Sequence, residues 1–341
     1  MQRTEKIEHL QTALREIAPD NQLATEPQLM APESMRAPVV LGRLAARRGY
    51  QPDFLELDDD RHVPLPTLTA KGKRAAARLE DDSLELRYHK FSIVMHKQRR
   101  MALFTASNVD WRAALRTVKG HKPTRKQLTG LADGVAEKWV TDPRISDDHQ
   151  LPDVFYSKDG GAFDKGHLVR RDDVCWGSSF KDMQKANGDT FHVTNCSPQV
   201  KGFNQGARGI DNWGDLESLI QRESKSEKLI LFAGPIFAEG DPVFDGSDQL
   251  GPAQVRIPRR YWKIVVAKGD LGPQVYGFTL TQDLSAIEFA VPTTWKRHMQ
   301  RVSVIEESLQ GLVSLAWCKR RDQFDTVRGR RVHESLADNG G

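Results

Sequence analysis

The chain has 341 residues, of which 38% are hydrophobic and 28% are charged, and its formal net charge is +4. This length suffices for one large mixed domain or two small ones, and the composition is ordinary for a globular protein. The absence of any run of 18 apolar residues excludes a membrane-spanning helix, and three cysteines without a C-x-x-C pair argue against a disulfide framework. A net charge this small does not by itself indicate a polyanionic partner.

The first 86 residues are expected to form an N-terminal extension that is partly helical and partly irregular. Apolar residues at spacings of three and four predict a short amphipathic helix over residues 5–18. Prolines interrupt residues 19–80, where short helices are expected at 43–48 and at 70–80. This extension is a candidate for docking on the body of the protein, on a second copy in a homodimer or on a regulatory protein.

Residues 87–318 are expected to form the main domain, and residues 319–341 a charged C-terminal tail. Two mainly apolar runs predict a hairpin of strands 91–95 and 101–106, joined by the basic turn 96–100. Residues 107–150 are largely loop. Further strands are expected at 229–233, 261–267 and 274–281, and a helix at 304–316. Strands and helices mixed without regular alternation indicate an α+β fold.

Three segments of this domain combine residues suited to phosphodiester hydrolysis. They are D-K-G-H-L-V-R-R from Asp164, T-N-C-S-P-Q from Thr194, and F-N-Q-G from Phe203 with W-G-D-L-E from Trp213. Such hydrolysis needs a neutral imidazole to take a proton from water, and cations to offset the negative charge that gathers on phosphorus and on the departing 3′ oxygen. A hard divalent metal, held by oxygen ligands, is suited to the second task.

The segments supply a candidate for each part. His167 follows Gly166, which is expected to allow a tight turn that presents the ring, and Asp164 is expected to support that turn. Asn204 offers a carbonyl oxygen, and a single amide ligand with retained waters suits Mg²⁺. Glu217 is expected to hold either a metal-bound water or the metal itself. The insert 207–212 is expected to loop out between these two residues.

The order of these motifs resembles the DNA/RNA non-specific endonuclease family, which includes the Serratia nuclease and endonuclease G. The family signature is D-R-G-H, then N-x-x-P-Q, then N-x-G followed by W-x-x-L-E, and the resemblance covers roughly residues 87–318. The resemblance implies a ββα-metal (His-Me finger) core with a central antiparallel sheet and flanking helices. It also implies Mg²⁺-dependent hydrolysis of DNA or RNA that leaves 5′-phosphate ends, with Mn²⁺ as a substitute metal.

The resemblance also implies roles for individual residues. His167 matches the family's general base, and Asn204 matches its sole direct protein ligand of the metal. Glu217 matches the acidic residue that contacts the water shell of the metal. Asn195 and Gln199 match polar residues that brace the site, and Gln199 is a candidate nucleic-acid contact.

The chain departs from the family signature at two cationic positions. Lys165 stands where the family usually has arginine, and Lys138 is the candidate for another family arginine that precedes a segment like the one beginning at Trp139. Lysine keeps the charge but loses the planar fork that holds phosphate through two bonds. Arg170 and Arg171 are therefore additional candidates for contacting nucleic acid.

The sequence thus predicts a metal-dependent nuclease that acts on DNA or RNA without strong sequence preference. One alternative is a nucleic-acid-binding module with weakened catalysis, which the two lysines favour. Another is an effector nuclease of a larger assembly that a partner controls through residues 1–86. The N-terminus has no apolar core of a secretory signal, so a cytoplasmic location is expected, with export by a signal-independent route left open.

Overall fold

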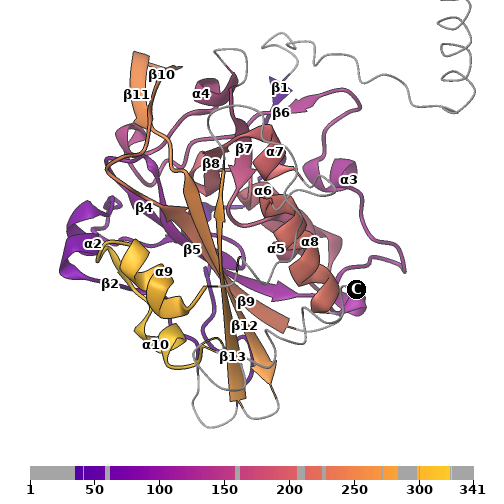
Figure 1. Ribbon diagram of the computed structural model, residues 1–341. Helices are drawn as coiled ribbons and strands as arrows, with labels where there is room; N and C mark the ends of the chain where they lie inside the picture. Colours follow the sequence, from indigo (N-terminus) through magenta and orange to yellow (C-terminus); the bar gives the residue numbers. More distant parts are fainter. Residues whose placement is uncertain are drawn as a thin grey trace, which may run out of the picture.

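The central element of the fold is an antiparallel sheet. The computed structural model describes residues 35–40, 42–57, 62–157, 162–205, 212–224, 228–269, 272–282, 298, 300–322 and 324. Within this part of the chain, six strands pair in the order β13-β12-β9-β5-β4-β3 (Figure 1). Their bounds are β3 Leu86–Arg87, β4 Phe91–His96, β5 Met101–Asp110, β9 Lys228–Ile236, β12 Arg260–Gly269 and β13 Gly272–Thr281. The α+β class with a central antiparallel sheet is confirmed.

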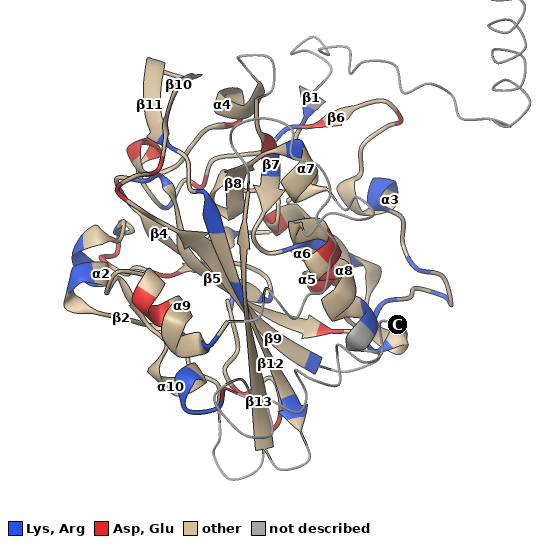
Figure 2. Ribbon diagram, viewed as in Figure 1, with Lys and Arg blue, Asp and Glu red and all other residues tan. Residues whose placement is uncertain are grey.

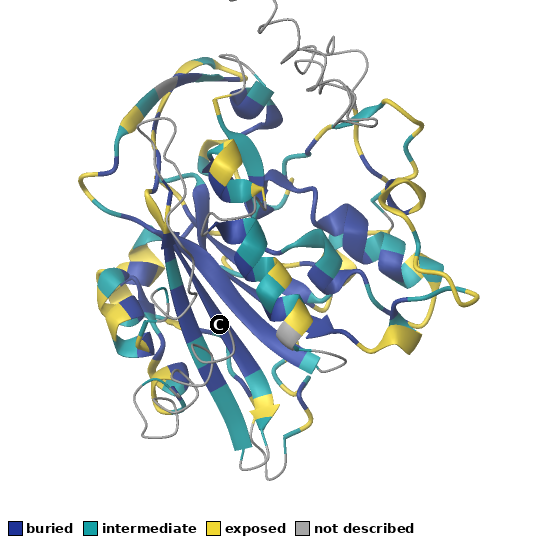
Figure 3. Cartoon of the chain, turned by 45° about the vertical axis from the view of Figure 1, so that its right-hand side comes forward, coloured by how far each residue is buried: buried dark blue, intermediate teal, exposed yellow. Residues whose placement is uncertain are grey.

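Helices cover both faces of this sheet (Figures 1 and 3). One face carries α5 (Arg171–Val174), α6 (Phe180–Asp189) and α8 (Trp213–Glu223). The other face carries α2 (Ala70–Ala75), α9 (Val302–Ser308) and α10 (Ala316–Lys319). The remaining helical segments are short: α3 Arg125–Thr129, α4 Asp153–Ser157, α7 Lys201–Asn204, η2 Leu44–Ala46, η3 Ala113–Leu115, η4 Asp147–His149 and η5 Val193–Asn195.

Each face of the sheet has its own hydrophobic core, because successive side chains of a strand point to opposite faces. On β9, Ile230 and Phe232 belong to the cluster that includes Ile305 of α9. Leu229 and Leu231 belong to the cluster that includes α8 residues such as Leu216. Burial on both sides explains why the strands β4 and β5 are buried along their whole length.

Four smaller strand pairs surround the sheet. They are β1 Met35–Arg36 with β6 Ala136–Glu137, β2 Thr67–Leu68 with β14 Val313–Ser314, β7 Asp164–His167 with β8 Cys196–Gln199, and β10 Val243–Asp248 with β11 Gly251–Arg256. The second pair joins residues near the N-terminal and C-terminal ends of the described chain. Tyr50, Leu55 and Val63 are also buried in the α9 cluster. The described part of residues 1–86 therefore packs on the same core as the main domain.

The predicted strands are confirmed, since β4, β5, β9, β12 and β13 all lie where the apolar patterns placed them. The helix expected at 304–316 is wrong. Its first part is α9, and the chain then turns through Gln310 (φ 52°) and Gly311 (φ 72°) so that Val313 pairs with Leu68. These left-handed conformations end a helix.

The helix expected at 70–80 is shorter than predicted, because Ala76 is extended and pairs with His96. The helix expected at 5–18 lies outside the described residues. Among the residues that are described, no helix is long and apolar enough to cross a membrane.

Candidate active site

The three sequence motifs meet in a small ββα unit at one end of the sheet (Figure 1). The strand β7 pairs with β8 in antiparallel register, so that Asp164 lies opposite Gln199 and His167 opposite Cys196. The helix α7 follows β8 almost directly and ends at Asn204. A hydrogen bond of 2.9 Å from Asn204 Nδ2 to Asp164 Oδ2 joins the helix to the first strand. Segments 40 residues apart thereby form one site.

His167 lies at the end of β7 in an aromatic pocket. The centroid of its ring is 4.5 Å from that of Trp139 and 5.7 Å from that of Phe191. The Nε2 atom is closed off from solvent and has no hydrogen-bond partner among the described residues, whereas Nδ1 is not closed off. Burial, and then the positive charges of Arg125, Arg171 and Arg170, lower the pKa of His167 to about 3. The ring is therefore neutral at pH 7, the form that accepts a proton.

The Asp164 carboxylate orients the amide of Asn204. Its Oδ2 atom accepts hydrogen bonds of 2.9 Å from Asn204 Nδ2 and 2.9 Å from Gln205 Nε2. With its nitrogen engaged, Asn204 has Oδ1 left for another contact, and no described residue donates to that oxygen. The expected role of Asp164 in a turn is therefore corrected, since the carboxylate acts across the ββα unit.

Gly166 does not form the tight turn that was predicted before His167. Gly166 is a residue of β7, and the Gln199 side chain packs directly against it. A Cβ atom on Gly166 would lie 2.1 Å from Gln199 Oε1, so a larger residue would have to displace the Gln199 side chain. Gln199 is fully buried, and both polar atoms of its amide lack a hydrogen-bond partner among the described residues. It therefore lies beneath the site, away from the surface that nucleic acid would approach.

Asn195 braces the segment that follows His167. Its Oδ1 accepts a hydrogen bond of 2.9 Å from the amide of Val169, and its Nδ2 donates to the carbonyl oxygens of Val169 at 3.0 Å and Thr190 at 3.1 Å. The side chain is fully buried. This arrangement fixes the backbone around His167 and leaves no part of the amide facing solvent.

Glu217 lies on α8, where it is engaged by two cations. Its Oε1 is 3.0 Å from Lys263 Nζ, and its Oε2 is 3.7 Å from Arg170 Nε. Arg170 also donates to Gln221 Oε1 at 3.0 Å. Burial raises the pKa of Asp173 beside this cluster. Arg170 and Glu217 therefore belong to a partly buried network of ion pairs. The helices α7 and α8 are separate, with residues 206–211 outside the described chain.

The two lysines that replace family arginines have different surroundings. Lys165 lies on the same strand face as His167, and its Nζ is 2.6 Å from Asp153 Oδ1, which also accepts the backbone N–H of Trp139 at 2.9 Å. Lys138 is exposed, and its side chain has no described contact, while the next residue, Trp139, packs on His167. The structure thus brings Lys165 to the site but not Lys138.

Sequence reasoning missed Arg125, whose charge is the largest contribution after burial to the low pKa of His167. Arg125 is the first residue of α3, which lies at the molecular surface (Figure 2), and Glu137 holds its guanidinium through two contacts. The signal was present in the sequence. Thr124 and Gln127 form a capping box, a pattern that marks the start of a helix. Arg171 also lowers the pKa of His167 and, unlike Arg125 and Arg170, has no ion-pair partner among the described residues.

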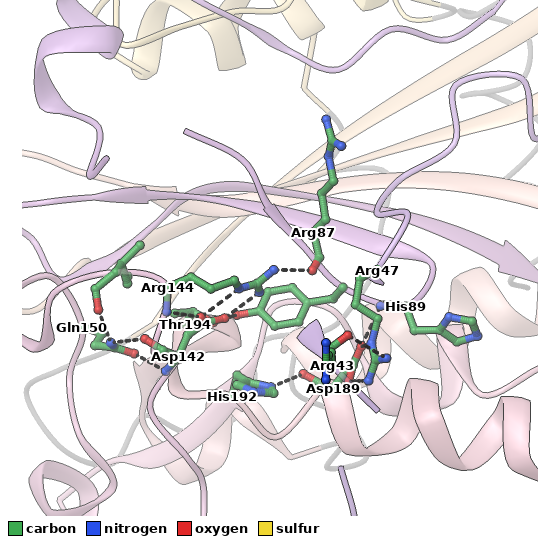
Figure 4. Close-up of polar contacts among 12 residues, drawn as sticks. Arg43, Arg47, Arg87, His89, Asp142, Arg144, Gln150, Asp189, His192 and Thr194 are labelled. Carbon is green, nitrogen blue, oxygen red and sulfur yellow. Dashed lines mark hydrogen bonds and ion pairs between the residues drawn. The ribbon is translucent and has the colours of Figure 1, made fainter. Parts of the chain in front are cut away.

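A buried polar network supports the loop that carries Trp139 and Asp153 (Figure 4). Asp142 accepts hydrogen bonds from Arg144 Nη2 at 2.6 Å and from Tyr88 Oη at 2.5 Å. Thr194, the residue before Asn195, lies 2.6 Å from the same Tyr88 oxygen. The network fastens this loop to the segment before β8, which fixes the aromatic wall around His167.

The donor set around Asn204 suits a hard cation that keeps most of its water. No group of three or more His, Cys, Asp or Glu side chains that could hold a metal occurs among the described residues. Cys175, Cys196 and Cys318 are buried free thiols. One amide oxygen fixed by a neighbouring carboxylate therefore fits Mg²⁺ better than a metal that needs a full set of protein ligands.

A comparison with known families matches residues 73–320 to the DNA/RNA non-specific endonuclease model. The chain belongs to this family. Its motifs D-K-G-H, N-C-S-P-Q and F-N-Q-G all lie within the matched range. The arrangement of β7, β8 and α7 is the ββα unit that the resemblance implied.

Individual relatives extend this result. An uncharacterized protein y4fB of Sinorhizobium fredii is 34% identical over 280 residues, which are 76% of this chain and 37% of the relative. Mitochondrial endonuclease G of Homo sapiens is 27% identical over 53% of this chain and 57% of its own length. The chain thus spans less than two thirds of these relatives. A crystal structure of the EndoG/EndoGI complex aligns with a TM-score of 0.49 and 14% identity, over 69% of this chain and 86% of that one.

Proposed function

We propose that this protein is a metal-dependent nuclease that hydrolyses phosphodiester bonds of DNA and RNA without strong sequence preference, leaving 5′-phosphate ends. Membership of the family supports the class of reaction. One observation supports the mechanism most directly. His167 has a neutral ring whose Nδ1 is not closed off from solvent, and it lies on the same ββα unit as the oriented amide of Asn204.

His167 acts as the general base through Nδ1. Since Nε2 is buried without a partner, Nδ1 is the nitrogen that water can reach, and this role requires the neutral ring to carry its hydrogen on Nε2. A pKa near 3 makes the free ring a weak base. A bound phosphodiester brings negative charge beside Arg125 and Arg171, which offsets their effect and raises the pKa of His167 when substrate is present.

Asn204 would hold Mg²⁺, or Mn²⁺ in its place, through Oδ1, with Asp164 fixing the amide. When bound, this cation supplies positive charge that stabilises the departing 3′ oxygen. Lys165 adds positive charge on the face of β7 that carries His167, and Asp153 positions its ammonium group. Arg125 and Arg171 add charge to the same region, which favours the phosphate backbone of either nucleic acid.

The experiment that tests this function is incubation of the purified chain with plasmid DNA and with RNA of matched sequence, with Mg²⁺ and with EDTA. We expect cleavage of both substrates with Mg²⁺, no cleavage with EDTA, and product ends that accept ligation because they carry 5′-phosphate. Intact substrate together with measurable binding would contradict the proposal and would favour a binding module without catalysis.

Cellular location and control remain proposals. A cytoplasmic location and a regulatory or dimeric contact through residues 1–86 rest on the sequence alone, and residues 1–34 lie outside the described structure. Deletion of residues 1–85 would not test regulation alone, because it also removes the core residues Tyr50, Leu55 and Val63. Removal of residues 1–34 leaves these core contacts intact and is the better comparison.

A further inference from the structure

A second basic pocket lies away from His167. It has a volume of about 380 Å³ and is formed by the segment 42–54, the residues His89 and Lys90, and α6 with the loop before it. None of the site residues His167, Asn204 or Lys165 lines it. Asp189 at the end of α6 accepts hydrogen bonds from Arg47 of the lining, and two residues later Phe191 packs on His167. One short segment therefore contacts both the pocket and the candidate active site.

Some cations of the pocket are neutralised by the fold. Arg47 makes two hydrogen bonds to Asp189, of 2.7 Å and 2.8 Å, as Figure 4 shows. His89 Nε2 lies 2.6 Å and Lys90 Nζ 3.2 Å from the Asp182 carboxylate. These pairs shape the pocket wall, because each joins α6 to a segment that precedes it by about 90 residues or more.

Three other cations of the lining have no such partner. Arg43, Arg48 and Lys185 all line the pocket, and no described residue pairs with their side chains. No aspartate or glutamate occurs in the lining. Like charges that converge on a hollow repel one another, and a bound anion relieves this repulsion. The absence of an acidic wall distinguishes this pocket from an ordinary salt-bridged surface.

Two aromatic residues also line the pocket. Trp176 and Phe54 lie with their ring centroids 5.4 Å apart, and Lys90 Nζ sits 4.1 Å from the Trp176 centroid. Trp176 Nε1 donates to the carbonyl oxygen of Asn108 at 3.0 Å, which fixes the ring against β5. Aromatic rings and unpaired cations in one lining suit a ligand that has both an apolar part and a negative charge, and the volume is that of a small-molecule site.

We propose that this pocket is a second anion site, which binds a phosphate ester: one unit of a nucleic-acid backbone or a free nucleotide. Arginine binds phosphate through its planar fork, and Arg43 and Arg48 supply two such groups at the exposed rim. Lys185 supplies a third charge from α6. This binding does not depend on the proposed cleavage, since it needs neither His167 nor a metal.

The test compares two triple variants of the full chain in EDTA, where no cleavage is expected. One is Arg43→Ala, Arg48→Ala and Lys185→Ala. Its control is Lys73→Ala, Arg74→Ala and Lys97→Ala, which removes the same charge from residues exposed on α2 and on the turn after β4. Fluorescence anisotropy measures the binding of a labelled 12-nucleotide single strand. Calorimetry measures the binding of adenosine monophosphate as the free nucleotide.

We expect the pocket variant to bind the strand about tenfold more weakly than the control variant, with a smaller dependence on salt. Loss of strand binding alone identifies a backbone site, and parallel loss of adenosine monophosphate binding identifies a site that also takes free nucleotides. Equal affinities of the two triple variants for both ligands would overturn the inference. His167→Ala is expected to bind the strand like the wild type, so failure of the nuclease proposal leaves this result interpretable.

Discussion

The ββα unit and the cluster around Glu217 both contain polar residues of the family motifs but differ in how these polar groups are engaged. In the ββα unit, His167 Nδ1 and Asn204 Oδ1 have no described partner. In the cluster, Lys263 and Arg170 each pair with Glu217, and the Lys263 side chain is only 1% exposed. Groups without protein partners are available for water, metal and substrate, whereas groups that satisfy one another mainly hold the fold.

Residues of one sequence motif can therefore differ in role: one can be available to a ligand while another stabilises the fold. Glu217 and Asn204 belong to one family pattern, yet Asn204 faces the Asp164 side of the unit while Glu217 joins α8 to β12. Variants at the two positions test whether the residues differ in function as they differ in contacts.

Asn204→Ala is expected to raise the Mg²⁺ concentration needed for half-maximal cleavage by about 10- to 100-fold. The variant removes the amide oxygen that would hold the cation and leaves Asp164 in place. A Mg²⁺ titration of plasmid cleavage measures the effect. Gln205→Ala is the matched control, because it removes the other amide on the same Asp164 oxygen. Identical titrations for the two variants would remove Asn204 from the metal site.

Glu217→Ala is expected to lower the free energy of unfolding by about 3 kcal/mol, because it leaves Lys263 buried without its partner. Denaturant unfolding measures this change. The exposed pair Lys126 and Asp133 supplies the control, since Asp133→Ala should have a much smaller effect.

A second variant decides whether Glu217 also acts in catalysis. Glu217→Ala combined with Lys263→Met removes both charges and is expected to regain most of the lost stability. Recovery of cleavage together with stability supports a structural role. A stable double variant that does not cleave would place Glu217 in the water shell of the metal and would break the contrast drawn above.

Arg171→Ala is expected to move the acidic limb of the pH profile of kcat/KM to higher pH. Burial, Arg125 and Arg171 hold the pKa of His167 below its ordinary value near 6.5, so the wild-type limb lies below pH 6.5. Removing a cation makes the protonated ring less unfavourable, which raises the pKa. Cleavage rates measured from pH 2.5 to 8, a range that includes the pKa near 3, test this direction. A limb that moves to lower pH, or not at all, would show that Arg171 does not act on His167.

The sheet was predictable from the sequence because its strands are long, apolar and buried on both faces. Phe91–His96 and Met101–Asp110 have this pattern and lie where it placed them. The short strands β7 and β8 gave no such signal, since four residues of mixed polarity do not show a period. Only the motifs D-K-G-H and N-C-S-P-Q indicated that these two segments are important.

The position of the site was therefore predictable, but the partners of its residues were not. The motif order placed His167 and Asn204 together. Nothing in the sequence near Gly166 indicated that a glutamine 33 positions later would exclude a side chain there. In the same way, the pairing of Lys165 with Asp153 and the proximity of Arg125 depend on loops that only the folded chain brings to β7.

The most direct test of the account is the single-turnover cleavage rate of His167→Ala with saturating Mg²⁺, measured beside His62→Ala, which changes an exposed histidine outside the site. We predict that His167→Ala loses about 10²- to 10⁴-fold in rate while His62→Ala cleaves like the wild type, with both variants folded and binding substrate. Cleavage by His167→Ala at the wild-type rate would show that another group takes the proton from water.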